Sequence, residues 1–454
     1  MSSSYATSRD TLSADYPCQR LQISANVVYQ ISELPNGLRI ATAEMPHMAS
    51  ASLGFWAAVG SRHESASEHG AAHFVEHLLF KGTQTRSASA IAREIEGAGG
   101  SLDAYTSEDH TCYYARGPAE LFESMADVIA DMYQHPALKP ADIDNERSVI
   151  KEEIAMVFDQ PSQYLDDLLS GAAWGEQNPL GRPITGTTKS TSALGQSELR
   201  HFFDRHYVGC QSIIAAAGNI THQQTLDAVA SRMADLPAGT LPILEKPCLQ
   251  KSPAAFSVAT RETEQIHFSI AFHAFDRKDD HRYSQKLLSV LLGENMSSLL
   301  FQKLREEEAV CYSIQSDVTT FEDAGMFHIY CALDPQHLTR ALEVITHTLI
   351  DLRHNLADAQ MLAEAKSYAI GQSQIALEST SSQMTWLGES IMAYGKLIDP
   401  AKSQQRLEAV HLEQIRHVAN ELFTPERLII AAVGPKGVES TLAKWQAEYS
   451  TTNK

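Results

Sequence analysis

Apolar residues follow two different spacings along the chain. Segments 38–44 (LRIATAE) and 51–59 (ASLGFWAAV) are short, largely apolar runs of the kind found in buried strands. In segment 118–134 (PAELFESMADVIADMYQ) apolar residues recur every three or four positions, which predicts an amphipathic helix. Strands and helices do not alternate strictly. We therefore expect an α+β fold, in which helices pack against mainly antiparallel sheets.

The chain contains an internal repeat. Arg200–His201 corresponds to Arg416–His417, Ile213–Ile214 to Ile429–Ile430, and Gly218 to Gly434, each pair 216 residues apart. The segments that begin at Pro118 and Pro335 match at nearly the same offset. Shared offsets of this kind predict a duplicated domain of about 200 residues.

A proline-spaced segment separates the two repeats, with prolines at 237, 242, 247 and 253. Such spacing is typical of an extended linker. We accordingly predict a disordered lead-in over 1–26, a first domain over 27–236, a linker over 237–253 and a second domain over 254–445.

Composition narrows the functional classes. The formal net charge of −20 disfavours nucleic-acid binding, which requires a basic surface. An acidic surface attracts basic peptides or metal cations, and the alternative is that the charge serves solubility alone. The six cysteines include no CxxC pair, which favours reduced thiols. We find neither an apolar signal core nor a run that could cross a bilayer. The expected location is the bacterial cytoplasm, ahead of the mitochondrial matrix or the periplasm.

The stretch HFVEH carries the strongest chemical signal. Gly70 and Gly82 flank it, as expected at the two ends of a short helix. Positions i, i+3 and i+4 of a helix share one face, so His73, Glu76 and His77 point the same way.

Two imidazoles one helical turn apart can bind one zinc ion, and a neighbouring carboxylate can take a proton from bound water. The order H-x-x-E-H is the inverted form of the zincin motif. The alternative is a pair of hydrogen-bonded helix histidines beside a surface glutamate. The second repeat contains no HxxEH, which favours a role that belongs to the first repeat alone.

A third protein ligand is expected for catalytic zinc. The helix-like segment ERSVIKEEI offers Glu146 and Glu153, which lie seven residues apart on one face, and Glu152 beside them. Spacing alone does not select one of these three acids.

The segments GSRHE, HGAAHFVEHLLFKGT and ERSVIKEEI resemble the pitrilysin and insulysin metallopeptidases. The likeness is greatest to the beta subunit of mitochondrial processing peptidase and its bacterial two-domain relatives. This resemblance implies Glu153 as the third zinc ligand, at the family's spacing from His77, with Glu146 supporting the site. It also implies one zinc ion per chain and two duplicated domains that form half of a clamshell.

The resemblance implies further substrate contacts. MSSLLFQKLREEEAVCYSI supplies Arg305 and Tyr312, which match a pair in the family that holds peptide carbonyls and the oxyanion. GGSLDAYTSEDHTCYYARG matches the family's edge strand, so the substrate backbone would pair with Leu102, Asp103, Ala104, Tyr105, Thr106 and Ser107. Asp103 stands where asparagine is commoner in the family, and Ala309 where glycine is usual.

These features predict a zinc endopeptidase with Glu76 as the general base. It would cleave unfolded or presequence-like peptides, with basic peptides favoured by the charge, inside a chamber closed by dimerisation. The partner would be a second copy or an inactive homologue. One alternative is a non-catalytic core or scaffold subunit of the same fold. The other is S-ribosylhomocysteine lyase, a much shorter HxxEH enzyme with a cysteine ligand that has no counterpart here.

Overall fold

The computed structural model describes residues 16–242, 244, 247, 255–354 and 357–452. The chain divides into two compact units. The first comprises Met1–Ile154, Pro183–Leu244 and Gln374–Ser403, and the second comprises Ala155–Arg182, Glu245–Ser373 and Gln404–Lys454. Each unit is therefore assembled from separate stretches of sequence.

The first unit is built on a seven-stranded sheet with the order β1-β2-β3-β7-β4-β6-β5. Only β3 and β7 pair in parallel, so the sheet is mainly antiparallel. The strands are β1 (Cys18–Ser24), β2 (Val27–Glu33), β3 (Arg39–Glu44), β4 (Ser50–Ala57), β5 (Ser101–Thr106), β6 (Thr111–Pro118) and β7 (Ser212–Gly218).

The second unit repeats five consecutive strands of the first, from β3 to the edge strand β5. Its sheet has the order β10-β11-β9-β12-β8, and β12 pairs with β8 in parallel as β7 does with β3. The strands are β8 (Phe256–Thr260), β9 (Ile266–Ala274), β10 (Ser313–Thr320), β11 (Gly325–Leu333) and β12 (Leu428–Gly434). Strands β7 and β12 begin and end 216 residues apart, which confirms the duplication predicted from the sequence.

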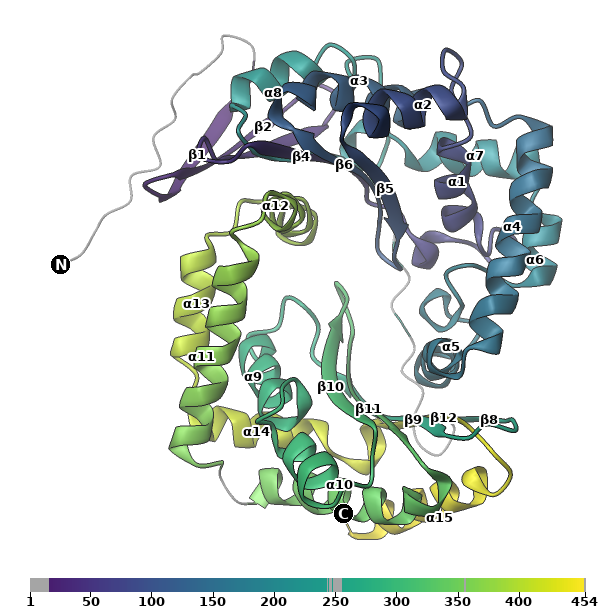
Figure 1. The fold of residues 1–454 in the computed structure, drawn as a ribbon, viewed down its shortest axis with the longest axis vertical. Helices are drawn as coiled ribbons and strands as arrows, with labels where there is room; N and C mark the ends of the chain where they lie inside the picture. The colour runs from purple at the N-terminus through teal and green to yellow at the C-terminus, as the bar shows by residue number, and fades with distance from the viewer. Residues whose placement is uncertain (1–15, 243, 245–246, 248–254, 355–356, 453–454) are drawn as a thin grey trace. The chain divides into compact units, whose positions relative to one another are not determined.

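Helices cover both faces of the first sheet (Figure 1). One face packs against α1 (Ala71–Leu79), α2 (Ala88–Ile95), α3 (Phe122–Gln134), α7 (Gln196–His206) and α8 (His222–Val229). The opposite face packs against α12 (Thr380–Tyr394), whose Met384, Leu387 and Ile391 contact the cluster around Trp56. Helix α6 (Thr188–Ala193) also belongs to this unit, and α4 (Pro140–Asp159) begins in it and runs on into the second unit.

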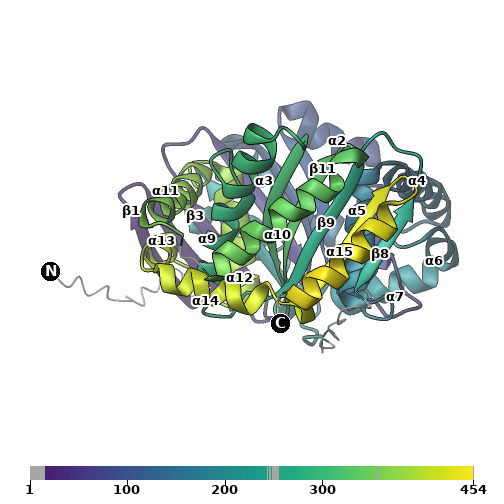
Figure 2. The same cartoon turned by 90° about the horizontal axis from the view of Figure 1, so that it is seen from below.

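The second sheet is covered in the same way. One face packs against α9 (Arg282–Gly293), α10 (Leu338–His354), α14 (Leu412–Leu422) and α15 (Val438–Thr452), and Figure 2 shows α10 and α15 in front of this sheet. The other face receives Leu165, Leu169 and Trp174 of α5 (Pro161–Trp174). Helices α11 (Ala359–Ala376) and α13 (Pro400–Glu408) each contribute residues to both units.

Two helices are thus exchanged between the repeats. Helix α5 follows the first repeat's α4 but completes the second unit, whereas α12 lies within the second repeat but completes the first unit. The domains predicted as continuous ranges, 27–236 and 254–445, do not account for this exchange, because each observed unit includes a helix from the other range. The amphipathic pattern of a helix indicates that one face is buried but not which sheet buries it.

The N-terminal lead-in differs from the prediction. Residues 18–24 of the predicted segment 1–26 form β1, which pairs antiparallel with β2. Leu21 and Ile23 pack against the cluster around Trp56, which explains why this stretch is ordered. The predicted linker 237–253 falls partly outside the described residues. Its first residues, Pro237 and Ala238, accept hydrogen bonds from Gly209 and Cys210.

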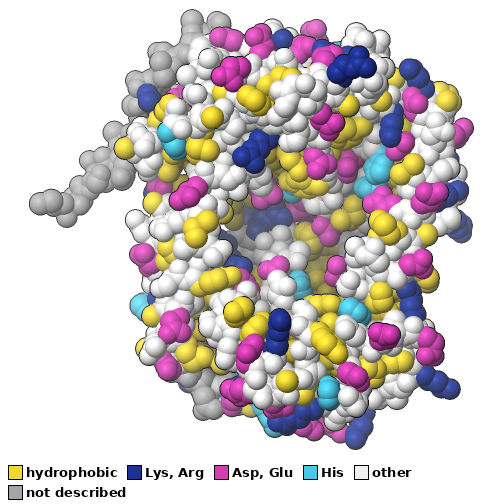
Figure 3. Space-filling view, in the orientation of Figure 1, with side chains coloured by type: hydrophobic (Ala, Val, Ile, Leu, Met, Phe, Trp, Pro, Cys, Tyr) yellow, Lys and Arg dark blue, Asp and Glu magenta, His cyan; other side chains and the backbone are white. Residues whose placement is uncertain are grey.

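No helix in the described part of the chain is long and apolar enough to cross a membrane. The acidic side chains on the face seen in Figure 3 are interspersed with basic and neutral ones. The negative charge is therefore not concentrated in one patch of that face.

Candidate metal centre

Helix α1 brings the two motif histidines together. Its apolar residues Phe74, Val75, Leu78 and Leu79 are buried in the core, which leaves the other side of the helix to His73, Glu76 and His77. The imidazole rings of His73 and His77 have their centroids 4.6 Å apart. The helix predicted between the two flanking glycines is confirmed, and its two histidines lie together.

Glu153, on α4, meets both histidines. Its Oε2 lies 3.7 Å from Nε2 of His73 and 3.7 Å from Nε2 of His77. Zinc bonds of about 2.0–2.1 Å in a tetrahedron separate neighbouring ligand atoms by about 3.4 Å. The three ligand atoms all lie within 4.8 Å of one another. Two imidazole nitrogens and one carboxylate oxygen at these distances fit a zinc ion with one coordination position left for water.

The other two acids of α4 are placed differently. Glu146 is buried, and its Oε2 lies 3.1 Å from Nδ1 of His77 while its Oε1 lies 2.7 Å from Nζ of Lys81. With a proton on Nδ1, His77 donates to Glu146, which orients the ring and leaves its Nε2 free to face Glu153. Glu152 is exposed and stands apart from the group.

Burial keeps His73 in the form that binds metal. Only 8% of the residue is exposed, and burial, together with the neighbouring His77, lowers the pKa of His73 to about 3. The ring is therefore neutral at physiological pH, with a free electron pair on one nitrogen. Its Nδ1 has no hydrogen-bond partner among the described residues.

Glu76 lies beside the edge of the first sheet. The hydroxyl of Thr106, the last residue of β5, donates to Oε2 of Glu76 at 2.5 Å. Burial raises the pKa of the Glu76 carboxyl, and the hydrogen bond from Thr106 acts in the opposite direction. A carboxyl group with a raised pKa suits proton transfer near neutral pH.

The predicted substrate strand is the outermost strand of the sheet. β5 pairs with β6 on one side only, so the backbone groups on its other side are not used within this sheet. Residues 102–106 lie within β5, and Ser107 begins the turn that leads to β6. The Asp103 side chain is exposed, and its Oδ1 accepts from the Ala104 N–H.

Arg305 and Tyr312 belong to the second unit. Arg305 lies in a π-helix (Phe301–Glu307), and its guanidinium is 4.9 Å from the centre of the Phe301 ring. Tyr312 is 63% exposed, and its backbone N–H donates to Ala332. Between them, Ala309 has a left-handed φ of +52°, the conformation that favours glycine. A contact of either side chain with substrate stays a prediction.

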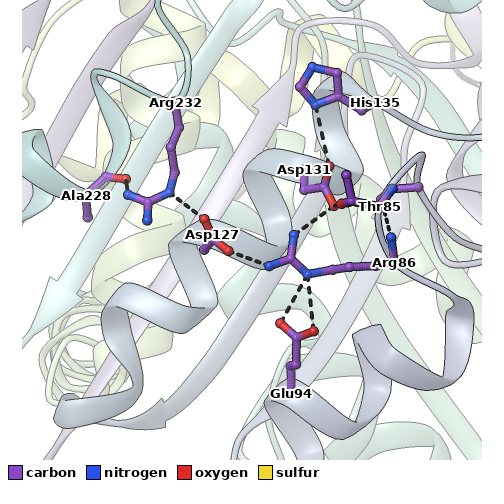
Figure 4. Close-up of polar contacts among 9 residues, drawn as sticks. Thr85, Arg86, Glu94, Asp127, Asp131, His135, Ala228 and Arg232 are labelled. Atoms are coloured by element: carbon purple, nitrogen blue, oxygen red, sulfur yellow. Dashed lines mark hydrogen bonds and ion pairs between the residues drawn. The ribbon is translucent and has the colours of Figure 1, made fainter.

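Sequence reasoning missed a polar cluster that anchors the chain just after α1. Arg86 reaches Glu94 and Asp131 at 3.1 and 2.8 Å and also pairs with Asp127, while Arg232 holds Asp127 from the other side (Figure 4). These contacts tie the segment that follows the helix to α3. The residues are spread over more than a hundred positions, so no local motif could reveal the cluster.

Comparison with known proteins identifies the family to which the chain belongs. Residues 39–188 match the insulinase (peptidase family M16) profile, and residues 193–368 match the profile of the peptidase M16 inactive domain. The chain is 35% identical over 415 residues to an uncharacterized zinc protease of Mycobacterium leprae, covering 90% of this chain and 93% of that one. It therefore belongs to the insulinase-type peptidase family M16, and the resemblance predicted from the sequence is confirmed.

More distant relatives are consistent with this family assignment. The chain is 28% identical over 420 residues to a probable mitochondrial-processing peptidase subunit beta of Arabidopsis thaliana, covering 89% of this chain and 78% of that one. A protease from Helicobacter pylori shares the fold with a TM-score of 0.83 at 19% identity, covering 90% of this chain and 99% of that one. The predicted α+β fold of two duplicated domains is thus confirmed.

Proposed function

We propose that the chain is a zinc-dependent endopeptidase with one zinc ion per chain. The observation that supports this most directly is the convergence of His73, His77 and Glu153 beside the partly buried carboxyl group of Glu76. A purely structural helix has no need to bring three metal-ligand atoms together next to a fourth titratable group. When bound, zinc would lower the pKa of a water molecule and polarise the scissile carbonyl.

The chain's own residues would handle the proton and the substrate. Glu76 would take a proton from the attacking water and deliver it to the leaving amine. Glu146 would hold the His77 ring through Nδ1. Tyr312 would donate to the developing oxyanion and Arg305 to peptide carbonyls, as the resemblance implies.

The substrate would bind as an added strand along β5. The free edge supplies backbone hydrogen bonds, which are the same for every peptide sequence. Such recognition requires an extended chain and therefore favours unfolded peptides or presequence-like segments. The net charge of −20 favours basic ones. We propose that a second copy, or an inactive homologue, closes the chamber, and that the protein acts in the cytoplasm.

Metal analysis and peptide digestion test the proposal together. Purified wild-type protein is expected to contain one zinc per chain by mass spectrometry and to cleave a random peptide pool. Glu76→Gln should keep the zinc and lose cleavage by about 10²–10⁴-fold, the usual contribution of a general base. The digestion is carried out at protein concentrations that favour dimers, because the proposed chamber is closed by a second chain.

A matched pair of variants tests the ligand assignment. Glu153→Ala should lose most of the zinc, whereas Glu152→Ala, one position away on the same helix, should keep it. Equal zinc content in the two variants would remove Glu153 from the site. Wild-type cleavage by Glu76→Gln would rule out Glu76 as the base, and a zinc-loaded wild type without cleavage would favour the scaffold role.

A further inference from the structure

The first turn of α1 receives its cap from outside the helix. The N-cap residue is Gly70, which has a left-handed φ of +91° and no side chain with which to accept a hydrogen bond. Glu64 supplies the acceptors instead. Its Oε2 accepts from the Gly70 N–H at 2.8 Å, and its Oε1 accepts from the Ala72 N–H at 2.8 Å. Both carboxylate oxygens of one side chain thus bind the start of the helix.

This cap is buried and charged. Glu64 is only 3% exposed, so water competes poorly for its oxygens. Hydrogen bonds to an ionised carboxylate are about twice as strong as neutral ones, and the positive end of the helix dipole strengthens them further. Ala72 directly precedes His73. The cap, supplied by a side chain six positions upstream of Gly70, therefore binds the backbone directly beside the first proposed metal ligand.

The segment that carries Glu64 is itself fixed to the turn after β5. The backbone N–H groups of Ser61 and Arg62 donate to the carbonyls of Ser107 and Glu108 at 3.1 and 3.0 Å. The Arg62 guanidinium pairs with Asp109 at 3.0 Å. A Cβ on Gly60 would lie 2.0 Å from the Ser107 carbonyl oxygen, so only glycine permits this approach.

These contacts link three segments beside the candidate site to one another. Segment 60–64 joins the start of α1 to the turn at 107–109, and Thr106, just before that turn, donates to Glu76 on α1. We propose that Glu64 is a positioning residue for the metal centre. Its carboxylate holds the first turn of α1 where His73 faces His77 and Glu153. This inference rests on the proposed zinc function and deepens it.

The test compares Glu64→Gln with Glu68→Gln. Glutamine has the same shape as glutamate, but its amide nitrogen cannot accept a hydrogen bond, so one of the two α1 amides loses its partner. Glu68 lies in the same loop and loses the same charge on substitution, but its side chain bonds the Ser65 N–H and Arg205. Zinc affinity is measured by competition with a chromophoric chelator, and thermal stability is measured on the zinc-free proteins.

We expect Glu64→Gln to bind zinc about 10–100-fold more weakly, as found for residues that orient metal ligands, and Glu68→Gln to stay within about twofold of wild type. Glu64→Asp is measured alongside in case the glutamine variant does not fold. Its shorter side chain reaches at most one of the two amides, so it should weaken binding by several-fold.

Wild-type zinc affinity in every folded Glu64 variant would overturn the proposal, even if their stability fell, because Glu64 would then be purely structural. Equal weakening in Glu68→Gln would also overturn it, because the cause would be the charge of the loop. A wild-type protein that binds no zinc would instead refute the proposed function.

Discussion

The packing of α12 against Trp56 predicts opposite effects for two glycine-to-alanine substitutions. Trp56 is fully buried, and a Cβ on Gly388 would lie 2.8 Å from three carbons of its indole ring. A Cβ on Gly54 would lie 2.5 Å from the same ring. The ring is thus confined between two glycines and cannot move aside. Gly371, within α11, is the matched control, because a Cβ there would meet nothing within 4 Å.

The magnitudes follow from two opposing contributions. Alanine in place of glycine inside a helix stabilises it by about 1 kcal/mol. Overpacking a well-filled core costs about 1–3 kcal/mol. Gly371→Ala should therefore raise the free energy of unfolding by about 1 kcal/mol. Gly388→Ala should lower it by about 0–2 kcal/mol, which leaves the two variants about 1–3 kcal/mol apart.

Urea denaturation followed by far-ultraviolet circular dichroism measures both variants against wild type. If the two units unfold in separate transitions, Gly388→Ala should shift that of the first unit and Gly371→Ala that of the second. Gly388→Ala as stable as Gly371→Ala would refute the reasoning, because α12 would then not approach Trp56 this closely.

Three further predictions concern charge and metal. Burial lowers the pKa of His222 to about 4, below the unfolded value of about 6.5. The unfolded chain then binds more protons in this range, so stability should fall as pH decreases from about 6.5 to 4, by at most ~3 kcal/mol for this residue. His222→Gln should flatten that decline in pH-dependent denaturation. Arg86→Lys should lower the free energy of unfolding by about 1 kcal/mol, because lysine cannot reach three carboxylates at once. The control Arg340→Lys, at an exposed ion pair, should leave the free energy of unfolding unchanged within error. Zinc at about 100 times its dissociation constant should stabilise the wild type by ~2.7 kcal/mol, and Glu153→Ala should abolish this gain in thermal denaturation.

Local geometry explains what the sequence could predict. The i, i+4 spacing of His73 and His77 fixes their proximity on any helix, so the pair follows from the sequence alone. The choice of Glu153 does not follow from the sequence alone, because Glu146 and Glu152 share its helix. Only the packing of α4 against α1 distinguishes the three acids. The family resemblance supplied that choice, and the distances are consistent with it.

Other features depend on contacts between distant segments. The edge position of β5 follows from the strand order of a complete sheet, which no single strand encodes. Glu64 lies within the GSRHE segment, yet its capping role requires the loop to fold back onto the helix. The amphipathic pattern of α5 and α12 marks a buried face but does not name its partner.

The exchange of α5 and α12 between the two repeats has a consequence for folding during synthesis. While the ribosome is still producing the second repeat, the first sheet has all its strands but an uncovered aromatic and aliphatic surface around Trp56. The N-terminal unit cannot complete its folding until residues near 394 have been synthesised. Nascent chains therefore pass through a stage in which one apolar face of the first sheet is exposed. Fragments cut between the repeats should consequently recover native structure only when both are supplied together.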